Sequence, residues 1–98
     1  MELTSKQRAY LKSLASTLNP VFQVGKSSVT PEITAAVEQC FNNNELIKLN
    51  VLKNCDDDVH EIANVIADRT RSTLVQVIGK KIVLYKPFKE KQKIILPK

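Results

Sequence analysis

Two runs rich in β-branched residues, divided by a glycine and a lysine, place the strongest constraint on the fold of this chain. They form the stretch LVQVIGKKIVLYKP, residues 74–87, in which Gly79-Lys80 separates the runs. Such runs on either side of a two-residue turn are typical of a β-hairpin, whose glycine supplies a backbone angle that other residues disfavour. The pattern predicts two antiparallel strands, the second of which ends at Pro87.

The first third of the chain predicts a helix followed by a short strand. Thr4 and Gln7 have the spacing of a capping box, and apolar residues then recur at helical intervals. This helix is expected to end before Asn19-Pro20, because the residue preceding a proline disfavours helical angles. The apolar residues VFQV, 21–24, then predict a strand that ends at Gly25.

The middle of the chain predicts a second helix, a strand and a third helix. Thr30 and Pro31 are typical of a helix start, and this helix is expected to end in the three asparagines 42–44. The residues ELIKLNVL, 45–52, alternate between apolar and polar, which predicts a strand with one buried face and one wet face. The aspartates 56–58 precede a helical apolar pattern, and acidic residues favour a helix start.

The predicted order is therefore α-β-α-β-α-β-β, which belongs to the α/β (α+β) class. Helices that alternate with strands, together with a final antiparallel pair, imply a mixed sheet of four strands with helices packed on it. A chain of 98 residues suffices for one core, so residues 1–98 are expected to form a single domain with a basic tail at 87–98. Within that tail, the apolar residues IIL are expected to dock onto the domain.

The positive charge of the chain is concentrated at one end. The formal net charge is +5, yet residues 79–98 alone carry +6, from seven lysines and one glutamate. Clustered basic charge favours a polyanionic partner, because neutralising phosphates releases counterions. A tail that only promotes solubility remains the alternative.

Several classes of function receive no support from the residues. The N-terminal residues are polar and no apolar run approaches the length of a membrane span, which predicts a cytoplasmic protein. Cys40 and Cys55 are expected to be reduced structural thiols, and residues 56–58 lack the spacing of a metal-binding loop. With His60 as the one histidine, no catalytic set can be assembled, so neither an enzyme, a cofactor nor a small-molecule substrate is expected.

The residues GKSS, 25–28, lie where a strand passes to a helix. They resemble the end of a nucleotide-binding P-loop, but Pro20 stands where that motif needs its first glycine, and proline has no N–H for a phosphate. A short turn at a helix start can still hold a phosphate through backbone N–H groups, the helix dipole and Lys26. The alternative is that Gly25 only makes a tight turn and Lys26 is solvated.

Three segments of the chain carry a resemblance to a known family. They are LTSKQRAYLKSLASTLNPVFQVGKSSVT, NELIKLNVL and VQVIGKKIVLYKP. Together they resemble the single-domain, YhbY-like members of the CRM family, the chloroplast RNA splicing and ribosome maturation domains. The resemblance covers nearly the whole chain.

The resemblance implies a compact two-layer sandwich similar to the C-terminal domain of translation initiation factor three. It also implies RNA binding during assembly of the large ribosomal subunit, with residues 25–28 as a GxxG loop like that of KH domains. Two positions depart from the family pattern, since Ser28 and Arg71 stand where glycines are usual. Either Ser28 does not need a left-handed conformation or the backbone approaches RNA less closely, and its hydroxyl could donate to a phosphate.

The prediction from the sequence is thus a non-enzymatic, monomeric, ribosome-associated protein that binds precursor ribosomal RNA through its phosphates. A protein-protein adaptor on the ribosome and a DNA-binding domain are the alternatives. The amides that open the second helix are expected to assist in holding a phosphate. The predicted RNA-binding residues are Gly25, Lys26, Ser27, Ser28, Lys6, Arg8, Lys12, Lys80, Lys81 and Lys86.

Overall fold

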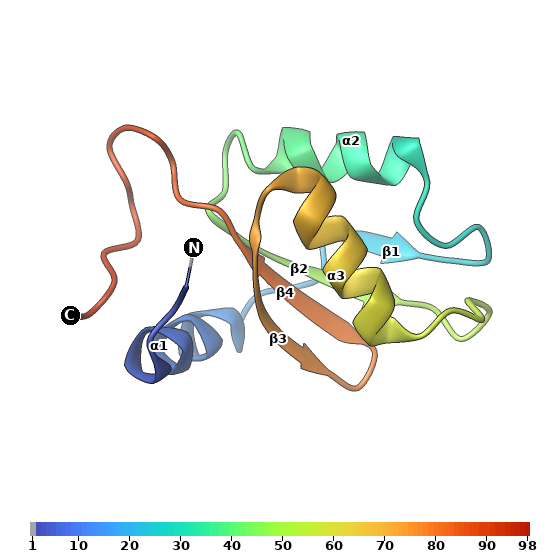
Figure 1. Ribbon diagram of the computed structural model, residues 1–98, viewed down its shortest axis with the longest axis horizontal. Helices are drawn as coiled ribbons and strands as arrows, with labels where there is room; N and C mark the ends of the chain where they lie inside the picture. The colour runs from blue at the N-terminus through green and yellow to red at the C-terminus, as the bar shows by residue number, and fades with distance from the viewer. Residues whose placement is uncertain (1) are drawn as a thin grey trace.

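The computed structural model describes residues 2–98 and contains three helices and four strands (Figure 1). In chain order these are α1 (Ser5–Ala15), β1 (Phe22–Val24), α2 (Pro31–Cys40), β2 (Leu46–Val51), α3 (Val59–Thr70), β3 (Thr73–Ile78) and β4 (Lys81–Tyr85). This order is the one that the sequence predicts. No helix within residues 2–98 is long and apolar enough to cross a membrane.

The four strands form one mixed sheet in the order β1-β2-β4-β3. β1 lies parallel to β2, with Val24 beside Val51, because α2 carries the chain back between them. β4 lies antiparallel to both β2 and β3, which confirms the predicted hairpin and the mixed sheet. The strand order itself is new information, since the periodicity of the sequence does not determine it.

Helices cover both faces of the sheet, with α2 and α3 on one side and α1 on the other (Figure 1). The predicted sandwich is confirmed, and α1 adds a third layer over part of the second face. The reason lies in β4, where Ile82 and Leu84 join the core under α2 and α3, whereas Val83 and Tyr85 pack with Leu11 of α1. A strand that is apolar on both faces requires cover on both faces.

The β2 strand shows where α1 stops covering the second face. Ile47 and Leu49 lie in the core below α2 and α3, as predicted. On the other face Leu46 packs with the α1 cluster, whereas Lys48 and Asn50 lie beyond it and are half-buried. The wet face predicted for this strand is therefore limited to its second half.

The predicted helix starts are confirmed. Thr4 and Gln7 form both hydrogen bonds of a capping box, each 3.1 Å long. Thr30 caps α2 with Pro31 at the first helical position, and Asp58 of the acidic run caps α3. Two helix ends fall earlier than expected, since α1 ends at Ala15 and α2 at Cys40.

Left-handed backbone angles occur at one glycine and at residues that carry a Cβ atom. Gly79 has φ 57°, the conformation predicted for the hairpin. Ser28 and Arg71 each have φ 56°, although this region costs a residue with a Cβ atom roughly 1–2 kcal/mol. Ser28 and Arg71 therefore adopt a backbone conformation that glycine would adopt more easily.

A buried carboxylate fastens the C-terminal tail to the domain. Glu45, which is 4% exposed, accepts hydrogen bonds from the backbone N–H groups of Phe88, Lys93 and Ile94 at 2.9, 2.8 and 2.7 Å. Ile94 and Leu96 also pack against the α1 cluster, which confirms docking for two of the three apolar residues IIL. Three charge-assisted bonds give the buried carboxylate the partners that it needs away from water.

Tyr85 lies close to this carboxylate and has no hydrogen-bond partner of its own within residues 2–98. Burial raises the pKa of its hydroxyl above the ordinary value, and the negative charge of Glu45 raises it further. Both causes favour the neutral phenol in the folded state.

Candidate nucleic-acid interface

Residues 25–28 form a tight exposed turn directly after β1. The backbone N–H of Ser28 donates to the carbonyl of Gly25 at 2.9 Å, which closes the turn and leaves Lys26 and Ser27 at its tip. Val24, the residue before the turn, is fully buried and paired with β2. The turn is therefore anchored at its base while both tip side chains face solvent.

The tip of the turn offers backbone donors as well as a positive charge. Within residues 2–98, the N–H groups of Lys26 and Ser27 donate to no acceptor. Adjacent free N–H groups beside a lysine form a local site for an anion, because they converge on one point and add partial positive charge. The tip of the turn is thus a candidate site for one phosphate group.

The start of α2 offers fewer free backbone N–H groups than the sequence suggests. Pro31 has no N–H, the N–H of Ile33 donates to Thr30 Oγ1 at 3.1 Å, and the N–H of Thr34 donates to the Thr30 carbonyl at 3.0 Å. In the first helical turn, only the N–H of Glu32 remains, beside a carboxylate of its own. The prediction that the amides opening α2 hold a phosphate is corrected, because the helix cap already uses them.

Gly25 lies in the turn without a positive φ, and the left-handed residue of the turn is Ser28. A Cβ atom at Gly25 would lie 3.6 Å from Leu52 Cδ1 and 3.7 Å from Asn54 Oδ1, which are ordinary contacts. Neither backbone angle nor packing therefore requires a glycine here. Because Ser28 has φ 56°, the interpretation that this position needs no left-handed conformation is ruled out.

The hairpin lysines lie at the same end of the sheet as the turn. The N–H of Val51 donates to the carbonyl of Lys80 at 2.7 Å, and Val51 pairs with Val24 on its other side. Since neighbouring strands lie about 4.8 Å apart, Val24 and Lys80 are separated by roughly 10 Å. The structure thus brings Lys80 and Lys81 beside the turn, as predicted.

A further lysine of this region was missed by the sequence analysis. Lys48 lies on β2 on the face away from α2 and α3, two residues from Asn50, which accepts a hydrogen bond from Lys81 Nζ at 3.0 Å. Gln23 of β1 pairs with Asn50 in register and shares this face. The alternation within β2 already placed Lys48 on the face opposite the core, and this signal could have found it.

The lysines of α1 lie far from the turn. The molecule measures 39 × 24 × 22 Å, and α1 and the loop between β1 and α2 lie at opposite ends of its long axis (Figure 1). Lys6 and Lys12 are exposed on α1. The structure therefore does not bring them together with residues 25–28, and only an RNA that follows the length of the protein could contact both groups.

Arg8 and Lys86 are half-buried and donate hydrogen bonds within the protein, and their contact with RNA stays a prediction. One guanidinium nitrogen of Arg8 donates to the carbonyls of Leu74 and Val75 at 2.9 and 2.6 Å, where the register of β3 shifts. Lys86 Nζ donates at 2.9 Å to the carbonyl of Thr70 at the end of α3. These cations satisfy backbone groups that the fold leaves open.

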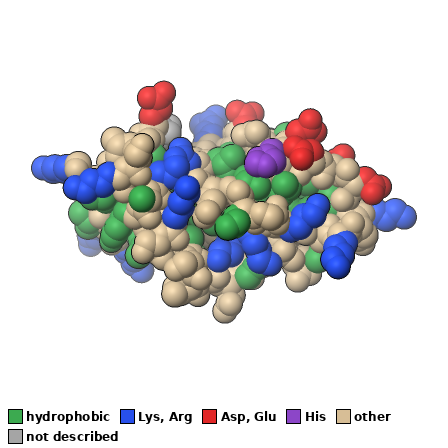
Figure 2. Space-filling view, turned by 90° about the horizontal axis from the view of Figure 1, so that it is seen from below, with side chains coloured by type: hydrophobic (Ala, Val, Ile, Leu, Met, Phe, Trp, Pro, Cys, Tyr) green, Lys and Arg blue, Asp and Glu red, His purple; other side chains and the backbone are tan. Residues whose placement is uncertain are grey.

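Positive and negative side chains occupy different parts of one face of the molecule. Figure 2 shows Lys and Arg side chains along the whole length of the face seen from below, whereas Asp and Glu side chains gather along one margin. The turn itself borders an acidic segment, since Asp57 and Glu61 at the start of α3 lie in the groove that also contains Ser27 and Ser28. Within residues 2–98, no group of three His, Cys, Asp or Glu side chains could hold a metal ion.

The sequence of this chain matches the model of a known domain family. The model of the CRS1 / YhbY (CRM) domain matches residues 3–86, which include the turn, the hairpin and all three helices.

Two curated proteins and one solved structure are similar over nearly their whole length. YqeI of Bacillus subtilis, which is named a probable RNA-binding protein, is 44% identical over 95 residues, 97% of this chain and 99% of its own. A protein of Haemophilus influenzae named RNA-binding protein is 40% identical over 96 residues, 98% of this chain and 96% of its own. The solution structure of a Staphylococcus aureus protein, titled as a candidate RNA binding protein, has a TM-score of 0.82 and 45% identity and covers 98% of this chain and 100% of its own.

Proposed function

Because this chain belongs to the CRS1 / YhbY (CRM) domain family, we propose that it is a non-enzymatic RNA-binding protein whose turn 25–28 binds a phosphate of the RNA backbone. The observation that carries the proposal is the tip of this turn, where two free N–H groups and the exposed Lys26 lie together. The names of the relatives support RNA as the class of partner.

The surroundings of the turn extend the proposed contact along the backbone. Lys80 and Lys81 lie roughly two strand spacings away, and Lys48 shares the face of Lys81. Gly25 fits the same role, since nothing in the protein requires it and a missing Cβ atom permits close approach of a phosphate. In this respect the turn acts like the GxxG loop of KH domains, which clamps the backbone.

The finer proposal is that the RNA is ribosomal and belongs to the precursor of the large subunit. It rests on the family resemblance in the turn, the ELIK strand and the hairpin, and it implies a cytoplasmic, ribosome-associated protein. Contacts made mostly to phosphates favour structure over sequence, so the protein would select a folded RNA region.

Charge reversal at the turn tests the proposal. We expect Lys26→Glu to weaken binding to ribosomal RNA fragments roughly ten-fold and to reduce the slope of log affinity against log salt by about one, because one phosphate contact is lost. Lys89→Glu, an exposed lysine of the tail, makes the same change in net charge away from the turn and serves as the control. Fluorescence anisotropy at several salt concentrations measures both quantities.

The same two variants test the ribosomal part in cells. Wild type and Lys89→Glu should sediment with large-subunit particles in sucrose gradients, and crosslinks should map to large-subunit RNA, whereas Lys26→Glu should stay near the top. An adaptor that binds ribosomal proteins would keep its position with Lys26→Glu. Affinity that does not change with salt would contradict the phosphate mechanism. Equal affinity for duplex DNA and structured RNA would contradict RNA as the specific partner.

A further inference from the structure

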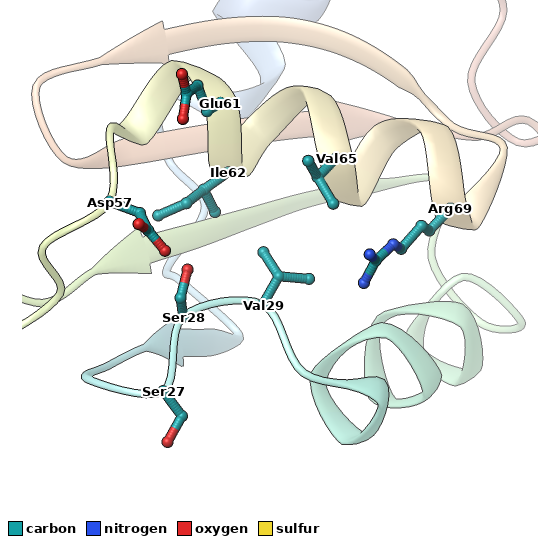
Figure 3. A pocket seen from close by; sticks show the side chains of 8 residues that line it. All are labelled: Ser27, Ser28, Val29, Asp57, Glu61, Ile62, Val65 and Arg69. Atoms are coloured by element: carbon teal, nitrogen blue, oxygen red, sulfur yellow. The ribbon is translucent and has the colours of Figure 1, made fainter.

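A groove of about 360 Å³ lies between the turn and α3. Its size falls at the lower end of the range of about 300–1,000 Å³ that is usual for small-ligand sites. Figure 3 shows that Val29 points across the groove toward α3, whereas Ser27 and Glu61 point away from it. The lining residues are Ser27, Ser28, Val29, Asp57, Glu61, Ile62, Val65 and Arg69.

The middle of the groove is apolar and open. Val29 faces Ile62 and Val65 of α3, and Val65 remains 37% exposed (Figure 3). Ile62 belongs to the core, so the floor of the groove is held rigidly by the packing of α3 on the sheet. A flat apolar ring could cover this strip and remove it from water.

The two ends of the groove carry opposite hydrogen-bonding groups. Asp57 lies at one end, where its carboxylate and the hydroxyl of Ser28 point toward each other, and Arg69 extends into the groove from the other end (Figure 3). Asp57 can only accept when ionised, and Arg69 can only donate. A molecule that fits between them needs donors on one edge and acceptors on another.

The charge around the turn decides which part of an RNA enters the groove. Lys26 projects from the tip, and Lys80 and Lys81 lie on the sheet side. The α3 side carries the carboxylates of Asp57 and Glu61, which repel a phosphate. The sugar-phosphate chain therefore belongs on the sheet side, and an uncharged base can turn toward α3.

We propose that the groove between residues 27–29 and α3 binds one unpaired guanine base of the RNA whose backbone the turn 25–28 holds. Guanine presents N1–H and N2–H donors together on one edge and the acceptors O6 and N7 on the other, which matches Asp57 and Arg69. Adenine and cytosine each place an acceptor beside their exocyclic amine, and this acceptor would face the Asp57 carboxylate. The inference rests on the proposed function and adds base selectivity to it.

Single-base substitution in the RNA provides the test. Short uridine strands with one central guanosine, inosine or adenosine are titrated against the full-length protein by fluorescence anisotropy. We expect the guanosine strand to bind about ten-fold more tightly than the adenosine strand, a ratio within the range of a bidentate base contact. Inosine lacks the N2 amine and should fall between them.

Substitution of Asp57 shows whether the groove causes the preference. Asp57→Asn should abolish the ratio between guanosine and adenosine strands. Asp56→Asn removes the same charge from the neighbouring exposed aspartate, which does not line the groove, and should keep the ratio. Because both variants raise general affinity for polyanions equally, only the ratio separates them.

The outcomes distinguish this inference from the proposed function. Equal affinity for all three strands, or a preference that survives Asp57→Asn, would overturn the guanine site and leave phosphate binding intact. Failure of every strand and of ribosomal RNA fragments to bind would overturn the proposed function itself. Loss of the ratio in Asp56→Asn as well would show a general charge effect and would also overturn the site.

Discussion

Ser28 and Arg71 hold left-handed backbone angles although both carry a Cβ atom. Ser28 closes the turn 25–28, and Arg71 ends α3, where its N–H donates to the carbonyl of Asp68 at 3.2 Å. A position that imposes φ near 56° on serine or arginine stores strain that glycine would avoid.

Replacing either residue with glycine should stabilise the protein. For Ser28→Gly and Arg71→Gly we expect the free energy of unfolding to rise by roughly 0.5–1 kcal/mol, which is the left-handed penalty less the greater entropy that a glycine loses on folding. Ser27→Gly is the matched control, since Ser27 is the neighbouring serine without a positive φ, and it should destabilise slightly. Urea unfolding measures all three, and equal values for Ser27→Gly and Ser28→Gly would contradict the argument.

Tyr85 makes the stability of the protein depend on alkaline pH. Because burial and Glu45 raise the pKa of Tyr85, the unfolded chain loses the phenolic proton first. The stability that this raised pKa contributes is fully present when the pH is below the ordinary tyrosine pKa of 10.0. It is lost as the pH rises through the higher pKa of Tyr85 in the folded protein.

Removing the hydroxyl of Tyr85 should make stability less dependent on alkaline pH. We expect the unfolding free energy of Tyr85→Phe to fall less than that of wild type between pH 9 and pH 11, roughly the range in which a tyrosine loses its proton. Tyr10→Phe, at the 40% exposed tyrosine of α1, should follow the wild-type curve. Guanidinium unfolding at several pH values tests this, and parallel curves for wild type and Tyr85→Phe would show that the hydroxyl has no such effect.

Glu45 determines how the C-terminal tail is attached. Its carboxylate accepts three backbone N–H groups from residues 88–94, and Gln7 adds a bond from α1 to the carbonyl of Pro97 at 3.1 Å. The tail is therefore part of the folded domain although it contains no helix or strand.

Replacing Glu45 with glutamine should release the tail. Glutamine keeps the shape but turns an NH₂ group toward backbone donors, so we expect a loss of roughly 2–3 kcal/mol in stability. The amides of Phe88, Lys93 and Ile94 should lose protection in hydrogen-exchange NMR, whereas Glu38→Gln, at an exposed glutamate of α2, should leave them protected. Unchanged protection in Glu45→Gln would mean that apolar packing alone holds the tail.

At the level of elements, local signals predicted most of the fold. The caps at Thr4, Thr30 and Asp58 and the turn at Gly79 depend on neighbours within a few residues, which is why the sequence predicts them well. The place of α1 on the second sheet face could not be predicted in this way. It depends on β4 being apolar on both faces and on a strand order that local patterns do not contain.

At the scale of the whole molecule, the site likewise has a part that local sequence predicts and a part that depends on long-range contacts. Lys26 and Ser27 are neighbours in sequence, so their common turn was predictable, but the approach of Lys80 depends on Val51 lying between two distant strands. The sequence also predicted Arg8, on a helix face, and Lys86, in the basic C-terminal cluster, as RNA-binding residues, and their long side chains reach backbone carbonyls that only the folded chain presents. Long-range contacts thus decide which cations also form hydrogen bonds within the protein.

The attachment of the tail to Glu45 also orders events during protein synthesis. The three amides that the carboxylate needs follow it by 43, 48 and 49 residues. Until those residues emerge from the ribosomal tunnel, the carboxylate keeps its hydration shell and the start of the β2 strand stays open to solvent. The nascent chain therefore completes its native packing only after the residues up to Ile94 have been translated and released.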